Sequence, residues 1–92
     1  MEFTHAKFGR MEIAEFTQAQ MERYGEAMVG KESQSLPQYY GECVRTAVRV
    51  GVLIEPRLSD EEIANAKPAQ VKWLAINVLN AVAEANNVDP LP

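Results

Sequence analysis

Two side chains in this 92-residue sequence are of types that often act as metal ligands, bases or nucleophiles. They are the single histidine, His5, and the single cysteine, Cys43. A structural zinc site of the usual Cys/His type needs four ligands, so one histidine and one cysteine cannot build it. A cysteine nucleophile works best when it is partly exposed beside a base or a positive charge. Cys43 instead lies near the centre of a predicted helix's apolar arc, where a free cysteine behaves as a small hydrophobic residue. We therefore expect Cys43 to pack in the core and His5 to lie at a strand edge.

The acidic side chains lack the arrangement of a catalytic or metal-binding pair. Glu22 and Glu26 lie one turn apart on a predicted helix, and three consecutive carboxylates occupy positions 60–62. Helix capping and a solvent-exposed helix face account for both groups. The sequence also has no glycine-rich phosphate loop and no nucleophile-elbow motif. We therefore predict a protein that is not an enzyme and that uses no catalytic residue, metal ion or cofactor.

The charge balance argues against nucleic acid as a partner. Nine Lys and Arg residues against 13 Asp and Glu residues give a net charge of −4, whereas binding to phosphates needs a cationic surface. Arg45 and Arg49 share a helix face that could enter a DNA groove. Glu42 lies on the same face and opposes that interpretation. We predict no nucleic-acid partner.

The sequence predicts neither a membrane span nor a signal peptide. Unbroken apolar stretches such as Val52–Ile54 are only three or four residues long, and a transmembrane helix needs roughly 20 residues. The first residues, 1–5, lack the positive and apolar regions of a signal peptide. A single cysteine forms no internal disulfide. We expect a cytoplasmic protein without a membrane partner.

The pattern predicts one domain over 1–92, mainly α-helical with a minor β part. Apolar residues alternate at Phe3 and again at Met11 and Ile13, with Gly9 between the two runs, which is typical of a hairpin. We expect this short β-hairpin over 1–16, three to four helices over 17–87, and a frayed tail over 88–92.

Capping residues locate the helices. Three Ser or Thr residues stand three positions before a Gln or Glu, the spacing of a capping box: Thr17–Gln20, Ser35–Gln38 and Ser59–Glu62. The predicted helices run over about 18–29, 36–50, 60–66 and 68–87, and residues 52–56 form an extended link. Gly25 falls on the buried stripe of the first helix, which suggests the close approach of another backbone.

Two of these helices, 36–50 and 68–87, have apolar arcs that exceed half of their circumference. A small three-helix domain cannot easily bury both arcs, and exposed apolar and aromatic surface marks interaction sites. Trp73 falls in a polar sector, and the adjacent Tyr39 and Tyr40 point about 100° apart. The alternative is that residues 52–66 cover Trp73 and the hairpin covers the rest. The first interpretation predicts a homo-oligomer whose protein-binding candidates are Trp73, Tyr39, Tyr40, Val48, Ile76 and Leu79.

The order of the elements resembles a known family. The start, from Phe3-Thr4-His5-Ala6 to Thr17, leads into a helix that begins Gln18-Ala19-Gln20. Later, residues 51–62 hold a proline and an acidic turn, and they precede a long apolar helix that begins Pro68-Ala69-Gln70. This layout is similar to that of small tail-assembly chaperones of long-tailed bacteriophages. Many members are longer, so the sequence could be a short form or a different small phage protein.

The resemblance implies a non-enzymatic protein that associates with itself and with a tape-measure or tail-tube protein. Such a protein keeps apolar segments soluble until assembly, by helix-in-groove contact or by strand addition at the hairpin. The alternative is a small acidic inhibitor or regulator that binds a host protein. An inhibitor of that kind more often concentrates its carboxylates, whereas here they are scattered along the chain.

Overall fold

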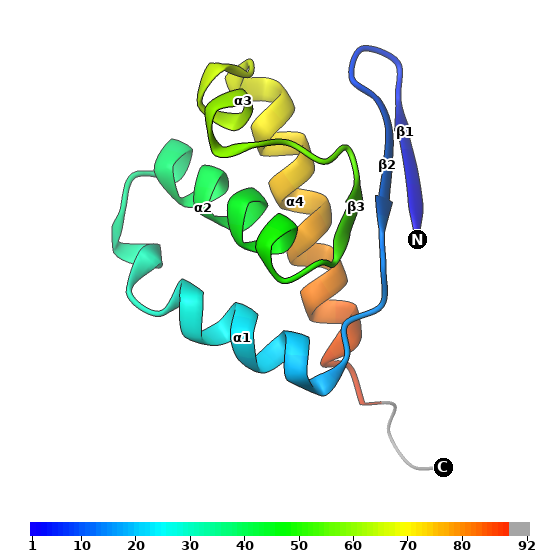
Figure 1. Cartoon of the computed structure of the whole chain (residues 1–92), viewed down its shortest axis with the longest axis vertical. Helices are drawn as coiled ribbons and strands as arrows, with labels where there is room; N and C mark the ends of the chain where they lie inside the picture. The colour runs from blue at the N-terminus through cyan, green and yellow to red at the C-terminus, as the bar shows by residue number, and fades with distance from the viewer. Residues whose placement is uncertain (89–92) are drawn as a thin grey trace.

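Over residues 1–88, which the computed structural model describes, the chain forms four α-helices, a 3₁₀ turn and a small antiparallel sheet (Figure 1). The elements in chain order are β1 (Glu2–His5), β2 (Gly9–Ile13), α1 (Gln18–Met28), η1 (Lys31–Ser33), α2 (Leu36–Arg49), β3 (Leu53–Glu55), α3 (Asp60–Asn65) and α4 (Pro68–Ala85). The predicted class, mainly α with a minor β part, is confirmed. Most of the predicted tail, 89–92, lies outside the described residues.

The capping boxes begin the helices where the sequence places them. The backbone N–H of Gln20 donates to Thr17 Oγ1 at 3.2 Å, and that of Glu62 donates to Ser59 Oγ at 3.1 Å. Before α2, the Ser35 N–H donates to Gln38 Oε1 at 3.3 Å. Each bond satisfies a backbone or side-chain group that a bare helix end leaves free. The predicted starts of α1, α2 and α3 are therefore confirmed.

A Schellman motif ends α2 and turns the chain into the sheet. Gly51 has a φ of +80°, a left-handed conformation that glycine adopts without a Cβ clash. The N–H of Val52 donates to the carbonyl of Ala47 at 3.1 Å, and that of Gly51 donates to the carbonyl of Val48 at 3.1 Å. The following residues form β3 (Leu53–Glu55), so the predicted link over 52–56 is extended as expected, and it also pairs with β2 as a strand. A three-residue strand is too short to show alternation, which is why its pairing was not predicted.

The hairpin lies within the predicted region and gains a third strand. β1 pairs antiparallel with β2, with Phe3 opposite Met11 and His5 opposite Gly9. β2 in turn pairs with β3, with Ile13 opposite Leu53. The pairing ends near Ile13, so the rest of the predicted 1–16 segment connects to α1 without strand structure.

α2 is the central helix of the fold. It contacts α4, α1, α3 and β3, and it lies between α1 and α3 in Figure 1. Such a position accounts for its wide apolar arc, because a helix with neighbours on several sides must bury more than one stripe. The sheet packs along one side of the helices, with Met11 and Ile13 of β2 buried in the core.

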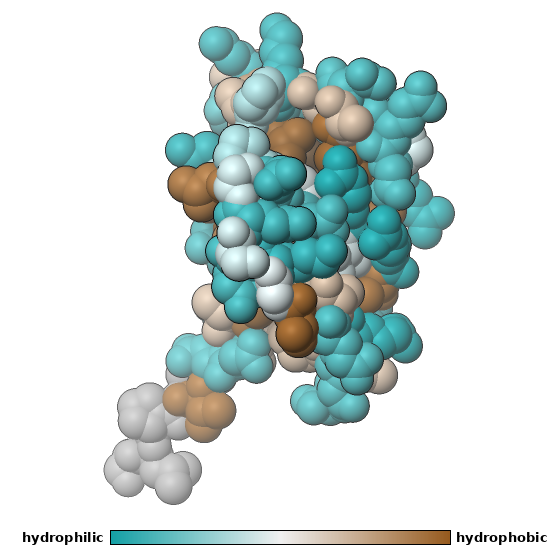
Figure 2. Space-filling model, turned by 90° about the vertical axis from the view of Figure 1, so that its left-hand side faces the viewer, coloured by the Kyte–Doolittle hydropathy of each residue, from teal (hydrophilic) through white to brown (hydrophobic). Residues whose placement is uncertain are grey.

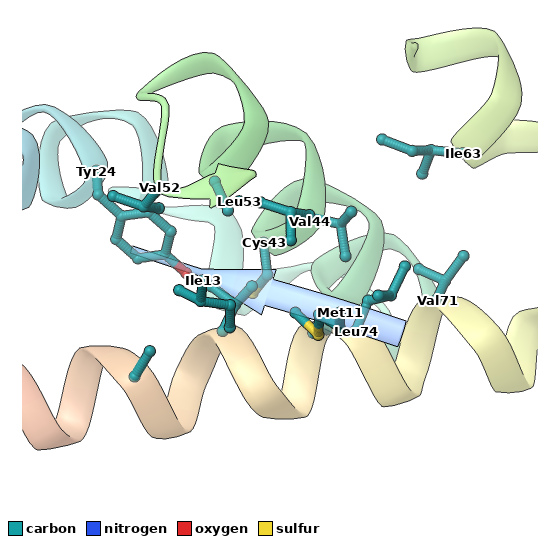
Figure 3. Close-up of a cluster of buried hydrophobic side chains, with 14 of the residues drawn as sticks. Met11, Ile13, Tyr24, Cys43, Val44, Val52, Leu53, Ile63, Val71 and Leu74 are labelled. Atoms are coloured by element: carbon teal, nitrogen blue, oxygen red, sulfur yellow. The ribbon is translucent and has the colours of Figure 1, made fainter. Parts of the chain in front are cut away.

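The core joins the sheet to α2 and α4. In Figure 3 the labelled side chains form one row, with Tyr24 and Val52 at one end and Ile63 and Val71 at the other. Cys43, Val44 and Leu74 lie between these ends and are fully buried. Most of the two wide arcs is therefore covered within one chain. Among residues 1–88, the large hydrophobic side chains that stay exposed are Met1, Val29, Leu36, Ile54, Ile76 and Val88.

Gly25 does not mark a backbone contact. It is exposed, and a Cβ atom added there would meet nothing within 4 Å. The buried stripe of α1 consists of Tyr24 and Met28, and Gly25 lies just outside it. The predicted close approach of another backbone is wrong for this chain.

Candidate functional site

The hairpin tip holds an aromatic cluster that includes Trp73. The ring of His5 stacks on Phe8 with centroids 4.5 Å apart, and Trp73 lies 5.4 Å from His5 and 6.1 Å from Phe8. His5 Nδ1 accepts a hydrogen bond from the Lys7 N–H at 3.0 Å, which fixes the imidazole against the turn. Trp73 is half-buried under this cover. The hairpin tip therefore covers part of the one tryptophan.

Cys43 packs inside the core, as predicted, next to two tyrosines. Burial raises the pKa of its thiol, which opposes formation of the thiolate that a nucleophile needs. Burial and the nearby Cys43 also raise the pKa of Tyr24 and of Tyr39. The Tyr24 hydroxyl has no hydrogen-bond partner among the described residues. These groups form an interior cluster, and the raised pKa keeps Cys43 as a neutral thiol at neutral pH.

Tyr40, which also belongs to α2, lines an open groove on the surface of the protein. The groove has a volume of about 740 Å³ and runs between the start of α2, α3 and the start of α4. Its apolar walls include the exposed Leu36, the half-buried Tyr40 and the buried Ile63 and Val71. The rings of Tyr39 and Tyr40 stay close, with centroids 6.3 Å apart, but of the two only Tyr40 lines this groove.

The groove is the place where the surface of α2 stays open. Leu36 is 64% exposed although it is the first residue of the helix's apolar arc. The face that carries η1 and the start of α2 is otherwise mostly hydrophilic, with hydrophobic atoms in small separate patches (Figure 2). A strongly exposed leucine beside an apolar hollow is the arrangement that a docking site for a partner side chain requires.

Charged side chains stand along the groove. Arg45 Nη1 lies 3.2 Å from Glu42 Oε1, and Lys31 Nζ lies 3.8 Å from Glu42 Oε2. The Arg45 guanidinium folds back over Gly41, where an added Cβ atom would come within 3.0 Å of Nη1. Lys72 also lines the groove, is exposed, and forms no ion pair within residues 1–88.

The other predicted binding residues do not converge on one surface feature. Val48 and Leu79 are half-buried against the core. Ile76 is 40% exposed on α4, and none of the three lines the groove. Of the six candidates, the structure brings only Tyr40 to the groove.

Most of the groove could not be predicted from the sequence. Leu36, Ile63, Val71, Arg45 and Lys72 come from three different helices, and only the packing of α3 beside α2 and α4 brings them together. The position of Leu36 was the one sequence signal for this surface. Leu36 follows the N-cap Ser35, and neighbouring elements often leave the first turn of a helix uncovered, so an exposed leucine could be expected there.

The described residues show no arrangement for metal binding or for crossing a membrane. Within 1–88, no three His, Cys, Asp or Glu side chains lie together where they could hold a metal ion. No helix in that range is both long enough and apolar enough to cross a membrane. Arg49, a candidate for DNA contact, instead pairs with Asp60 at 3.2 Å and links α2 to α3.

Comparison with protein-family models, with curated proteins and with solved structures found no match to this chain.

Proposed function

We propose that this protein is a non-enzymatic binding domain that holds an apolar segment of another protein in the groove between α2, α3 and α4. The observation that carries the proposal is the 64% exposed Leu36 beside an apolar hollow of about 740 Å³. Pockets that bind ligands commonly have volumes of about 300–1,000 Å³. Fully burying a leucine side chain contributes about 1.5–3 kcal/mol, so covering Leu36 would favour binding.

A helix laid in the groove suits its walls better than a strand does. The walls are helices, and the groove is lined by side chains with no free backbone edge among its lining elements. An amphipathic helix places apolar anchors at positions i, i+3 or i+4 and i+7, which can reach Leu36, Tyr40 and Ile63 in turn. We therefore expect a helical segment as the occupant.

The biological setting we propose is the assembly of a bacteriophage tail in the cytoplasm of the host. It rests on the resemblance in layout to small tail-assembly chaperones, and a tape-measure or tail-tube protein is the expected client. The open groove supports this role, because a chaperone must cover an apolar client segment and later release it. Self-association is a separate part of the proposal, and the exposed Ile54 and Ile76 support it.

Site-specific photo-crosslinking tests the groove. The experiment is done in cells that make the protein together with its natural partners. A photoreactive residue replaces Ala64, which is exposed and lines the groove, or Glu22, which is exposed on α1 outside it. We expect position 64 to give a crosslinked partner whose attached peptide is apolar on one face, and position 22 to give none. The same adducts at both positions, or none at position 64, would count against the proposal.

A further inference from the structure

We infer that the segment bound in the groove carries a carboxylate beside its apolar side chains, and that this carboxylate lies against Lys72. The inference rests on the proposed function and specifies the chemistry of the partner. The sign of the net charge in the groove differs from that of the whole protein. The chain as a whole has a net charge of −4, but the charged groove-lining side chains are Arg45 and Lys72 against the single anion Glu42.

The one anion of the groove is already engaged. Glu42 Oε1 faces Arg45 at 3.2 Å, and Glu42 Oε2 faces Lys31 at 3.8 Å. All three side chains keep only a minor exposed fraction, from 21% for Glu42 to 37% for Lys31. A cationic partner would therefore meet no free carboxylate on this wall.

The ammonium of Lys72 is the charge that remains available. Its side chain is exposed at the groove, and no carboxylate within residues 1–88 pairs with it. A segment that covers Leu36 and Tyr40 also removes water from the neighbourhood of Lys72. Loss of water around an unpaired charge costs free energy, and an opposite charge on the segment offsets that cost. A basic segment would instead be repelled, so the groove distinguishes partners by charge.

Selection of short random peptides displayed on a carrier tests this inference. The wild-type protein, Lys72→Gln and Lys67→Gln serve as baits. Lys67 is an exposed lysine at the start of the same helix, but it does not line the groove. We expect the wild type and Lys67→Gln to enrich apolar peptides that contain Asp or Glu, and Lys72→Gln to lose the acidic preference while keeping the apolar one.

A double-mutant cycle on one selected peptide measures the contact itself. Changing its acidic residue to the amide should weaken binding to the wild type about twofold to fivefold, the range of an exposed ion pair. The same change should have no effect on binding to Lys72→Gln. High salt should reduce the difference.

The outcomes separate the inference from the proposed function. Peptides that lose affinity with Leu36→Ser but show no acidic preference, or keep that preference with Lys72→Gln, would overturn the inference and leave the groove as a binding site. A selection that enriches no peptide, or only peptides that bind Leu36→Ser equally well, would overturn both.

Discussion

The hydroxyl of Tyr24 is the most unusual polar group in the interior. Tyr24 is only 5% exposed, and its Oη has no hydrogen-bond partner within residues 1–88. Burial next to Cys43 raises its pKa well above the ordinary value. A buried hydroxyl without a partner costs free energy relative to its hydrated state in the unfolded chain. The neighbouring Cys43 thiol, a weak hydrogen-bonding group, offsets little of that cost.

We predict that Tyr24→Phe raises the free energy of unfolding by up to about 1 kcal/mol at neutral pH. The ring keeps its edge-to-face contact with Phe16, whose centroid lies 5.6 Å away, and only the unpaired hydroxyl is lost. Urea unfolding measures the change. Tyr40→Phe at the open groove is the control and should change stability by less than about 0.5 kcal/mol. A loss of more than about 1 kcal/mol in Tyr24→Phe would show that the hydroxyl is bonded.

The same substitution should flatten the stability profile at alkaline pH. The native state keeps Tyr24 protonated because its pKa is raised, whereas the unfolded chain ionises it near pH 10. The unfolded state then binds fewer protons, so stability falls above that pH by about 1.4 kcal/mol per pH unit. Tyr24→Phe removes this part of the fall. The thiol of Cys43, whose pKa is also raised, keeps a similar contribution that begins near pH 8.5.

At the scale of elements, one aromatic cluster joins the tip of the hairpin to α4. Trp73 lies against His5 and Phe8 at the tip of the turn. An isolated hairpin is marginally stable in water, so its far end needs such an anchor. Trp73 was a candidate for partner binding, and its packing within the chain gives it a structural role first.

We predict that Trp73→Ala lowers the free energy of unfolding by about 1–3 kcal/mol and loosens the tip of the hairpin. The sequence alone, which made Trp73 a protein-binding candidate, predicts instead that the substitution affects association more than folding. Thermal unfolding together with amide exchange at residues 4–9 measures both effects. Ile76→Ala, one turn further along α4 and 40% exposed, should cost less than about 1 kcal/mol. If both variants lost the same small amount of unfolding free energy, Trp73 would not be an anchor for the hairpin.

Helix starts were predictable from the sequence, and the third strand was not. The capping boxes at Thr17, Ser35 and Ser59 depend only on neighbouring residues, and all three appear in the structure. The formation of β3 depends on the pairing of Leu53 with Ile13, which is distant in the sequence. Local chemistry cannot specify such a pairing, because the partner is chosen by the packing of α2 against the sheet. The groove was unpredictable for the same reason, since three helices supply its walls.

At the scale of the whole molecule, most large apolar side chains within residues 1–88 are buried or partly buried by contacts inside one chain. The wide arcs of α2 and α4 face each other and the sheet. Within residues 1–88 the exposed large hydrophobic side chains lie in separate places, with Leu36 at the groove, Ile76 on α4, Ile54 on β3, Val29 after α1, and Met1 and Val88 at the ends of that range. The prediction of a homo-oligomer therefore rests on these few side chains.

We predict that the protein sediments as a species larger than the 10.3 kDa monomer at micromolar concentration. Burial of the exposed apolar side chains between copies provides the free energy. Ile54→Ser and Ile76→Ser, tested separately, identify the surface used, because only the one at the interface should return the protein to a monomer. A single monomeric species across the concentration range would refute self-association and leave the groove free for a partner.

The pairing of β2 with β3 has a consequence for how the protein is made. The ribosome releases the N-terminal hairpin first, but the strand that flanks it follows only after α1 and α2 have been synthesised. Until then the inner edge of β2 offers unpaired backbone groups, and such edges are where nascent chains aggregate. A newly made copy therefore needs its own central helix before its first residues are protected, and slowing translation between residues 14 and 52 should lower the soluble yield.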